Sequence, residues 1–273
     1  MTPRLIASDI DGTFLDSHDR VTPRLRDAVM RAVHSGAHFA LATGRPHRWV
    51  FPVIDQLPIR PMCICANGAV LYDPSEDKVL TAHTLDPDVM ARIADIAQHV
   101  YEPHGGVAFG AERVGQSAFD PEEEAFVTTP NYSTEVWSEG HGVQPLHELV
   151  AQPAVKMILR NLAISSAEMF DLIADEIDPE EAHVTYSMND GLLEIAAPGI
   201  NKATGVSTLA AQLGVEQQDV ATFGDMPNDI EMLAWAGTGI AMSNAAPLVQ
   251  EVADFVTTSN DDFGVALVLE KWF

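Results

Sequence analysis

Acidic residues at the end of a short apolar segment could carry out phosphoryl-group chemistry. The segment Asp9-Ile10-Asp11-Gly12-Thr13 directly follows the predicted strand Leu5 to Ser8. One carboxylate can attack phosphorus to form an aspartyl-phosphate, and a second can protonate a leaving alkoxide and later deprotonate water. An isolated D-x-D-G segment is often only an acidic turn, so this hypothesis depends on the motifs that follow. We predict that Asp9 and Asp11 face one pocket.

A hydroxyl, a glycine and an arginine follow the next predicted strand, His38 to Ala42, as Thr43-Gly44-Arg45. The Thr43 hydroxyl and the Gly44 backbone N–H can bind phosphoryl oxygens at the start of a following helix. Arg45 can pair with a phosphate or with a surface carboxylate. Taken alone, the segment is equally typical of a plain strand-to-helix turn.

Lys202 is predicted to lie near the start of a helix, where a positive charge is unfavourable. Lysine is also scarce, because the chain has only Lys78, Lys156, Lys202 and Lys271. Both points favour a specific role over an ordinary surface position. We predict that Lys202 neutralises the phosphoryl group and the attacking aspartate.

The segment Gly224-Asp225-Met226-Pro227-Asn228-Asp229 follows the predicted strand Val220 to Phe223. Carboxylate oxygens suit Mg²⁺, which keeps several waters and takes few protein ligands. We predict that Asp225 binds the metal directly and that Asp229 supports the site from the start of the next helix. A single Asp here would be an ordinary helix cap, but the full segment is a less common pattern.

The predicted elements alternate between strands and helices at both ends of the chain. Strands at 5–8, 38–42 and 62–66 are separated by helices that begin after Thr22 and after Pro46, and Asn67-Gly68 is a turn signal. This order predicts a parallel sheet with right-handed crossovers. The alternation resumes from about residue 189, with a strand at 192–196 and a helix at 202–213.

The pattern changes between these two parts. A helix at 86–100 is followed by short strand-like pieces, and predicted strands at 155–159 and 183–187 lie on either side of a helix at 167–177. We predict an α/β fold with a Rossmann-like parallel-sheet core, residues 1–83 plus 189–273, and an inserted α+β domain, residues 84–188.

Composition excludes several classes of function. The 273 residues carry a net charge of −25, and no basic face is visible, which argues against binding to nucleic acid or to anionic membranes. No apolar run is long enough to cross a bilayer, and the N-terminal segment has acidic residues where a signal peptide would be apolar. We expect a cytoplasmic enzyme acting on a small-molecule phosphate ester, with a divalent cation to overcome the negative field.

The four motifs together resemble the haloacid dehalogenase-like (HAD) superfamily, and specifically its Cof-type hydrolases. The resemblance covers the whole chain and implies a HAD-like fold whose α+β cap is inserted after the third core strand. It implies a Mg²⁺-dependent phosphatase acting on a phosphorylated metabolite such as a sugar phosphate, through an aspartyl-phosphate on Asp9.

The resemblance also implies a role for each site residue. It makes Asp9 the nucleophile and a metal ligand, and Asp11 the acid/base whose backbone carbonyl binds the metal. It makes Asp225 the remaining metal ligand. The phosphate- and substrate-binding residues and their supports are then Thr43, Gly44, Arg45, Asn67, Gly68, Lys202, Asn228 and Asp229.

Three alternatives remain open from the sequence. A sugar phosphomutase of the same branch shares the motifs, but it would need cap residues that hold either end of a bisphosphate, and Arg92, Arg113 and Arg160 are scattered. A phospho-aspartate switch of the receiver type would be a single uncapped domain. A catalytically silent phospholigand-binding protein would tolerate the loss of Asp9 or Asp11, and both are present.

Overall fold

The computed structural model describes residues 2–132 and 140–273, which form two compact units. The core unit comprises Met1–Leu80 and Asn201–Phe273, and the inserted unit comprises Thr81–Ile200. No helix in the described ranges combines the length and the apolar character needed to cross a membrane.

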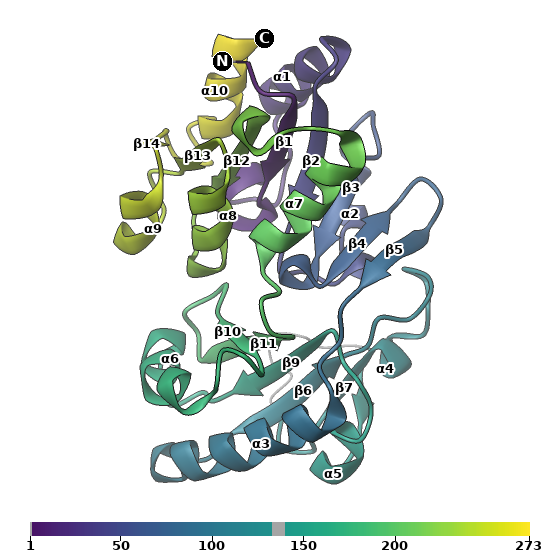
Figure 1. Cartoon of the computed structure of the whole chain (residues 1–273), viewed down its shortest axis with the longest axis vertical. Coiled ribbons are helices and arrows are strands. Elements are labelled where there is room, and N and C mark those ends of the chain that lie inside the picture. Colours follow the sequence, from purple (N-terminus) through teal and green to yellow (C-terminus); the bar gives the residue numbers. More distant parts are fainter. Residues whose placement is uncertain (1, 133–139) are drawn as a thin grey trace. The chain divides into compact units, whose positions relative to one another are not determined.

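The core unit is built on an eight-stranded sheet (Figure 1). Its strands, in spatial order, are β14 (Phe255–Val256), β13 (Thr238–Ala241), β12 (Val220–Gly224), β1 (Leu5–Ser8), β2 (His38–Ala42), β3 (Met62–Cys65), β4 (Val70–Asp73) and β5 (Lys78–Ala82). The strands from β14 to β3 are parallel, and β4 turns back antiparallel to β3. The predicted Rossmann-like parallel core is therefore confirmed.

Local sequence signals set the limits of the helices that flank this sheet. The Thr22 hydroxyl accepts the backbone N–H of Leu25 at 3.3 Å, so the first helix begins where the sequence predicts. Gly214 ends α7 with a φ of +64°. The helices of the core unit are α1 (Pro23–His34), α2 (Phe51–Ile54), α7 (Lys202–Leu213), α8 (Ile230–Trp235), α9 (Pro247–Val252) and α10 (Gly264–Trp272).

The described part of the inserted unit contains a six-stranded, mostly antiparallel sheet. Its strands, in spatial order, are β10 (His183–Thr185), β11 (Leu192–Ala196), β9 (Lys156–Arg160), β6 (Ala108–Glu112), β7 (Phe126–Thr128) and β8 (Gly142–Val143). Its helices are α3 (Pro87–Tyr101), α4 (Glu122–Ala125), α5 (Leu146–Leu149) and α6 (Ser166–Ile173). Apolar residues of α3 and α6 pack on one face of the sheet and form its hydrophobic core.

The position of β11 differs from the sequence prediction. We predicted that residues 192–196 belong to the resumed core, but β11 pairs with β9 and β10 in the sheet of the inserted unit. Buried Leu193 and Ile195 pack in that unit's core. The second junction between the units therefore lies at residues 200–201, about a strand later than the predicted boundary at 188–189.

Candidate active site

Three neighbouring parallel strands bring the first, second and fourth motifs to one edge of the core sheet. Strand β1 lies between β12 and β2, so the loops that follow these strands are adjacent. Asp9 follows β1, Thr43 follows β2, and Asp225 follows β12. Ligand sites in open α/β sheets form at this edge.

Lys202 connects two of these loops from the first turn of α7. Its side chain is fully buried, and its Nζ donates hydrogen bonds of 2.6 Å to Asp9 Oδ1 and of 2.6 Å to Asp229 Oδ1. Burial alone would lower the pKa of Lys202, but the two carboxylates raise it above its ordinary value. Lys202 is therefore a permanent cation beside Asp9.

Asp229 organises the loop after β12. Its Oδ2 accepts the backbone N–H groups of Asp225 at 2.9 Å and Met226 at 3.0 Å, while its Oδ1 accepts from Lys202. Both carboxylate oxygens are thus engaged in holding protein groups. This arrangement fits the supporting role that the sequence analysis gave to Asp229.

Asp225 is held by the segment that carries Asp9. Its Oδ1 accepts a hydrogen bond of 2.7 Å from the Thr13 hydroxyl, and Asn244 Nδ2 lies 3.5 Å from its Oδ2. A Cβ on Gly12, which has a φ of +79°, would lie 2.3 Å from that Oδ2, so this close approach requires glycine. Burial and the charge of Asp229 raise the pKa of Asp225 to about 7.

The carboxylates can form a metal site. Carboxylate oxygens of Asp9, Asp225 and Asp229 lie within 4.8 Å of one another, and all three side chains are buried. The carboxylates of Asp9 and Asp229 both contact the Lys202 ammonium, Asp225 adds a third negative charge nearby, and burial raises the pKa of Asp9 well above its ordinary value. A hard divalent cation would relieve this excess of negative charge, so the donor set fits Mg²⁺. Asp9 and Asp225 would hold it, because Asp229 is already engaged.

Asp11 has a different environment from the carboxylate cluster. Its side chain is 54% exposed and accepts two hydrogen bonds from Arg45, which are 2.8 Å from Nε to Oδ2 and 2.5 Å from Nη2 to Oδ1. The sequence left two possible partners for Arg45, a phosphate or a surface carboxylate. In this structure Arg45 pairs with a carboxylate, that of Asp11.

Thr43 and Gly44 lie in the turn that carries Arg45. The Thr43 side chain is buried, and its hydroxyl accepts the backbone N–H of Arg45 at 3.0 Å. The Thr43 carbonyl accepts the N–H of Asn67 at 3.0 Å. The turn that follows β2 is thus hydrogen-bonded to the turn that follows β3.

A hydrogen bond between two asparagines connects the loop after β12 with the turn after β3. Asn228 Nδ2 donates a hydrogen bond of 3.0 Å to Asn67 Oδ1, and both side chains are buried. Gly68 has a φ of +95°, and a Cβ there would lie 2.0 Å from the backbone oxygen of Asn201. The turn therefore packs closely against the start of the helix that carries Lys202.

Two buried carboxylates, those of Asp9 and Asp225, thus follow neighbouring parallel strands, and buried Lys202 reaches Asp9 from the first turn of α7. A sequence model of the haloacid dehalogenase-like hydrolase family matches residues 6–269. The chain belongs to this family. It is a hydrolase of the HAD superfamily, and the HAD-like fold predicted from the sequence is confirmed.

Several HAD relatives align over nearly the whole chain. The putative phosphatase YxeH of Bacillus subtilis is 32% identical over 276 residues, covering 98% of this chain and 97% of that protein. The 5-amino-6-(5-phospho-D-ribitylamino)uracil phosphatase YitU of the same organism is 29% identical, with coverage of 99% and 98%. The solved structure of the HAD subclass IIB sugar phosphatase BT4131 has a TM-score of 0.78 at 19% identity and covers 98% of each chain. That likeness supports the fold.

Two residues of this HAD site were given no role in the sequence analysis. Thr13 lies inside the first motif and donates to Asp225, and Asn244 Nδ2 donates a hydrogen bond of 2.8 Å to the backbone oxygen of Gly12. Asn244 follows the carboxyl end of β13, next to β12 in the sheet. The rule that sites form at strand ends could have identified it.

Proposed function

We propose that the protein is a Mg²⁺-dependent phosphatase that hydrolyses a small phosphorylated metabolite, a sugar or polyol phosphate, in the cytoplasm. The observation that carries this proposal is the hydrogen bond of 2.6 Å between buried Asp9 and the permanent cation of Lys202. The names of the relatives support the reaction class, and the name of YitU includes a phosphoribityl group.

In the first step Asp9 acts as the nucleophile. A carboxylate oxygen of Asp9 forms a bond to phosphorus, and the bond from phosphorus to the ester oxygen breaks. Asp11 gives its proton to the departing oxygen, so that an alcohol leaves rather than an alkoxide. Lys202 offsets the negative charge of Asp9 and of the incoming phosphoryl group.

In the second step Asp11 acts as a base. Its carboxylate takes a proton from water, the water oxygen bonds to phosphorus, and the bond from phosphorus to Asp9 breaks. Inorganic phosphate leaves, Asp9 is again a carboxylate, and Asp11 again carries a proton. The Thr43 hydroxyl and the Gly44 N–H are the proposed contacts to phosphoryl oxygens in both steps.

The proposed Mg²⁺, when bound by Asp9 and Asp225, supplies charge neutralisation for the phosphoryl oxygens. The Asp11 backbone carbonyl is the third protein ligand of this proposal. Asp229, Asn67, Gly68 and Asn228 would keep Lys202 and the surrounding turns in place.

The sugar phosphomutase is the second candidate, and the inserted unit gives it little support. Arg92 pairs with Glu181, Arg113 donates to the backbone oxygens of Leu149, Gln152 and Pro153, and Arg160 pairs with Asp190. Within the described part of the inserted unit, these arginines have three separate sets of partners and form no common site for a second phosphate.

Phosphate release from a panel of phosphate esters, measured with magnesium and with excess EDTA, tests the proposal. We expect steady release from sugar or polyol phosphates that requires magnesium. Conversion of one sugar phosphate isomer into another would favour the mutase, and a single turnover without release would favour a phospho-switch.

A further inference from the structure

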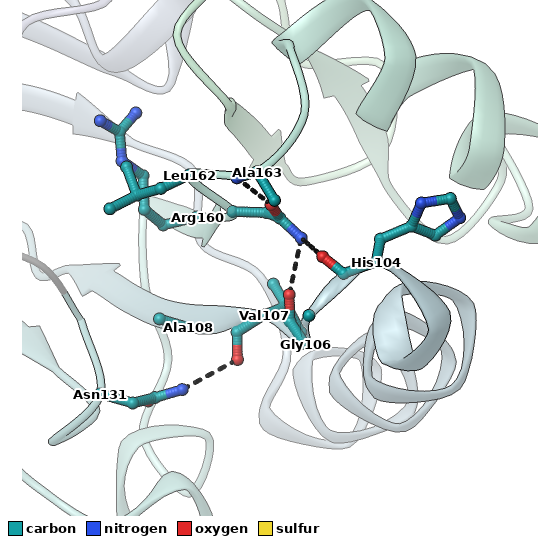
Figure 2. A pocket seen from close by; sticks show the side chains of 10 residues that line it. His104, Gly106, Val107, Ala108, Asn131, Arg160, Leu162 and Ala163 are labelled. Carbon is teal, nitrogen blue, oxygen red and sulfur yellow. Dashed lines mark hydrogen bonds between the residues drawn. The ribbon is translucent and has the colours of Figure 1, made fainter.

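Asparagine side chains connect neighbouring turns in both units. In the inserted unit, Asn161 Nδ2 donates to the backbone oxygens of His104 at 3.0 Å and of Gly106 at 2.8 Å (Figure 2). Asn131 Nδ2 donates in the same way to the backbone oxygen of Val107 at 3.2 Å. These hydrogen bonds fix the walls of a pocket with a volume of about 260 Å³. The core unit uses the same kind of contact at the strand ends that form the candidate active site.

Asn244 connects the loops that follow three neighbouring strands, β1, β12 and β13. It lies shortly after β13, and its Nδ2 donates a hydrogen bond of 2.8 Å to the backbone oxygen of Gly12, after β1. The same nitrogen lies 3.5 Å from Asp225 Oδ2, after β12. An amide N–H is a neutral donor, so unlike a lysine it can hold the Asp225 carboxylate without neutralising it. The negative charge of Asp225 therefore remains available to a cation.

The orientation of the Asn244 amide follows from its neighbours. Its Nδ2 faces two oxygens, and its Oδ1 accepts the backbone N–H of Asn260 at 3.2 Å. The reverse orientation would place an oxygen against two oxygens and an N–H against an N–H, so only this orientation forms hydrogen bonds. Asn260 thereby directs the donor of Asn244 toward the candidate active site.

Asn260 also holds the end of the turn that contains Gly12. Its Nδ2 donates a hydrogen bond of 2.8 Å to the backbone oxygen of Leu15, and the Leu15 N–H donates to the backbone oxygen of Ile10 at 2.9 Å to close the turn. The two asparagines are therefore joined to each other and bind two carbonyls of one turn.

The Gly12 turn determines where the Asp11 carbonyl points. Gly12 has a φ of +79°, a left-handed conformation that favours glycine, and its N–H belongs to the same peptide group as the Asp11 carbonyl. That carbonyl is the third protein ligand of the proposed Mg²⁺ site. Asn244 binds the Gly12 carbonyl and Thr13 binds Asp225, so two hydrogen bonds hold the turn beside Asp225.

The loop that carries Asn260 is fixed by contacts of its own. Ser259 Oγ donates to Asp262 Oδ2 at 2.8 Å, and Thr258 Oγ1 donates to the Asp262 backbone oxygen at 2.9 Å. Phe263 has a φ of +62°, which is strained for a residue with a side chain and persists only where surrounding contacts impose it. The loop therefore presents Asn260 in a fixed position.

We propose that Asn244 and Asn260 are positioning residues for the divalent cation, and that they raise its affinity by holding the Gly12 turn and Asp225 in place before it binds. This inference rests on the proposed Mg²⁺ site and extends it beyond the ligands themselves. Neither asparagine contacts the cation in this proposal. Without them the loops would have to become ordered when the cation binds, and that ordering lowers the affinity.

Titration with Mn²⁺, followed by electron paramagnetic resonance with Mg²⁺ as competitor, measures cation affinity without turnover. Mn²⁺ takes the same oxygen ligands as Mg²⁺. Asn244→Ala should raise the Kd about 10-fold, as expected when a residue that orients a metal ligand is removed. Asn260→Ala keeps the backbone N–H that binds Asn244 but loses the Leu15 contact, so it should raise the Kd about 3-fold. Asp225→Asn reports the Mn²⁺ that surface carboxylates bind, and this background is subtracted.

Gln250→Ala is a matched control that separates cation affinity from loop stability. Gln250 Nε2 donates to the backbone oxygens of Ser243 at 3.2 Å and Ala245 at 3.0 Å, on either side of Asn244. This variant should lower the free energy of unfolding in urea with EDTA, as Asn244→Ala does, but leave the Kd for Mn²⁺ unchanged. An equal rise of the Kd in the two variants would reduce the effect to loop stability and overturn the inference.

The wild type and Asp225→Asn separate failure of the inference from failure of the proposed metal site. If Asp225→Asn loses the wild-type Mn²⁺ site but both asparagine variants keep the wild-type Kd, the inference is wrong while the metal site stands. If the wild type and Asp225→Asn bind Mn²⁺ equally, the proposed metal site fails, and the inference fails with it.

Discussion

Arg45 holds both carboxylate oxygens of Asp11, through hydrogen bonds of 2.8 Å from Nε and 2.5 Å from Nη2. Both oxygens of Asp11 are therefore occupied by Arg45, and neither is free to approach a leaving group. The pair must therefore loosen before Asp11 acts as an acid. In the proposed mechanism Arg45 is a positioning residue, because it acts on the reaction through Asp11.

Replacing Arg45 separates this positioning role from direct phosphate binding. If Arg45 positions Asp11, Arg45→Met should leave the exposed Asp11 side chain without a fixed position and reduce the phosphorylation rate from a sugar phosphate about 10-fold or more, because an alkoxide leaving group needs a proton from a correctly placed acid. Nitrophenolate needs little such help, so the rate from p-nitrophenyl phosphate should change much less. Rapid-quench measurement of phosphoenzyme formation gives both rates.

Arg60→Met is a matched control, since Arg60 forms an exposed salt bridge with Asp55. Equal losses for both substrates, with weaker inhibition by inorganic phosphate, would instead make Arg45 a phosphate ligand.

Replacing Lys202 should destabilise the fold as well as abolish turnover. Lys202→Met leaves buried Asp9 and Asp229 without their shared cation, and removal of one partner from a buried ion pair costs about 3–5 kcal/mol. Urea unfolding in EDTA measures the loss. The double variant Lys202→Met/Asp229→Asn should recover part of it, because one uncompensated carboxylate is removed. Unchanged stability of the single variant would show that the three groups are not coupled.

Asp225 should make the metal-free protein less stable as pH rises. Its pKa is raised from 3.8 to about 7, so the folded state retains a proton that the unfolded chain has already released. In EDTA the free energy of unfolding should therefore fall between about pH 4 and about pH 7, by ~4 kcal/mol at most. Urea unfolding across this range measures the slope, and added Mg²⁺ should flatten it.

Asp225→Asn provides the matching variant for this experiment. It should be more stable than the wild type in EDTA at pH 7, have a shallower pH dependence, and lose the rise in melting temperature that Mg²⁺ gives the wild type. Asp95→Asn, at an exposed position of α3, should behave as the wild type does. If Mg²⁺ raised the melting temperature of the Asp225→Asn variant as much as that of the wild type, Asp225 would be excluded as a Mg²⁺ ligand.

The helices and strands of the core unit could be predicted where capping residues mark a helix end or where a short apolar run marks a buried strand. Thr22 and Pro23 fix the start of α1, Gly214 fixes the end of α7, and the short apolar runs at β1, β2 and β12 suit buried parallel strands. The motifs after these strands could therefore be placed at one edge of the sheet.

The sequence could not reveal which sheet β11 joins. Its residues, Leu192–Ala196, are all buried, and a short run that is apolar except for Glu194 suits a strand of either unit. Only its pairing with β9 and β10 assigns it to the insert. The sequence also could not predict the partner of Arg45. The geometry of the turns after β1 and β2 decides whether Arg45 contacts Asp11 or a phosphate, and that geometry depends on the three-dimensional structure.

The nucleophilic role of Asp9 is tested most directly by trapping the phosphoenzyme. Asp11→Asn should slow the second step, so the variant mixed with p-nitrophenyl phosphate and Mg²⁺ and then quenched in acid should accumulate a phosphorylated protein. Peptide mass spectrometry should place one phosphoryl group on Asp9, and the Asp9→Asn variant should show neither this product nor turnover. A phosphoryl group on another residue, or near wild-type turnover by Asp9→Asn, would contradict the mechanism.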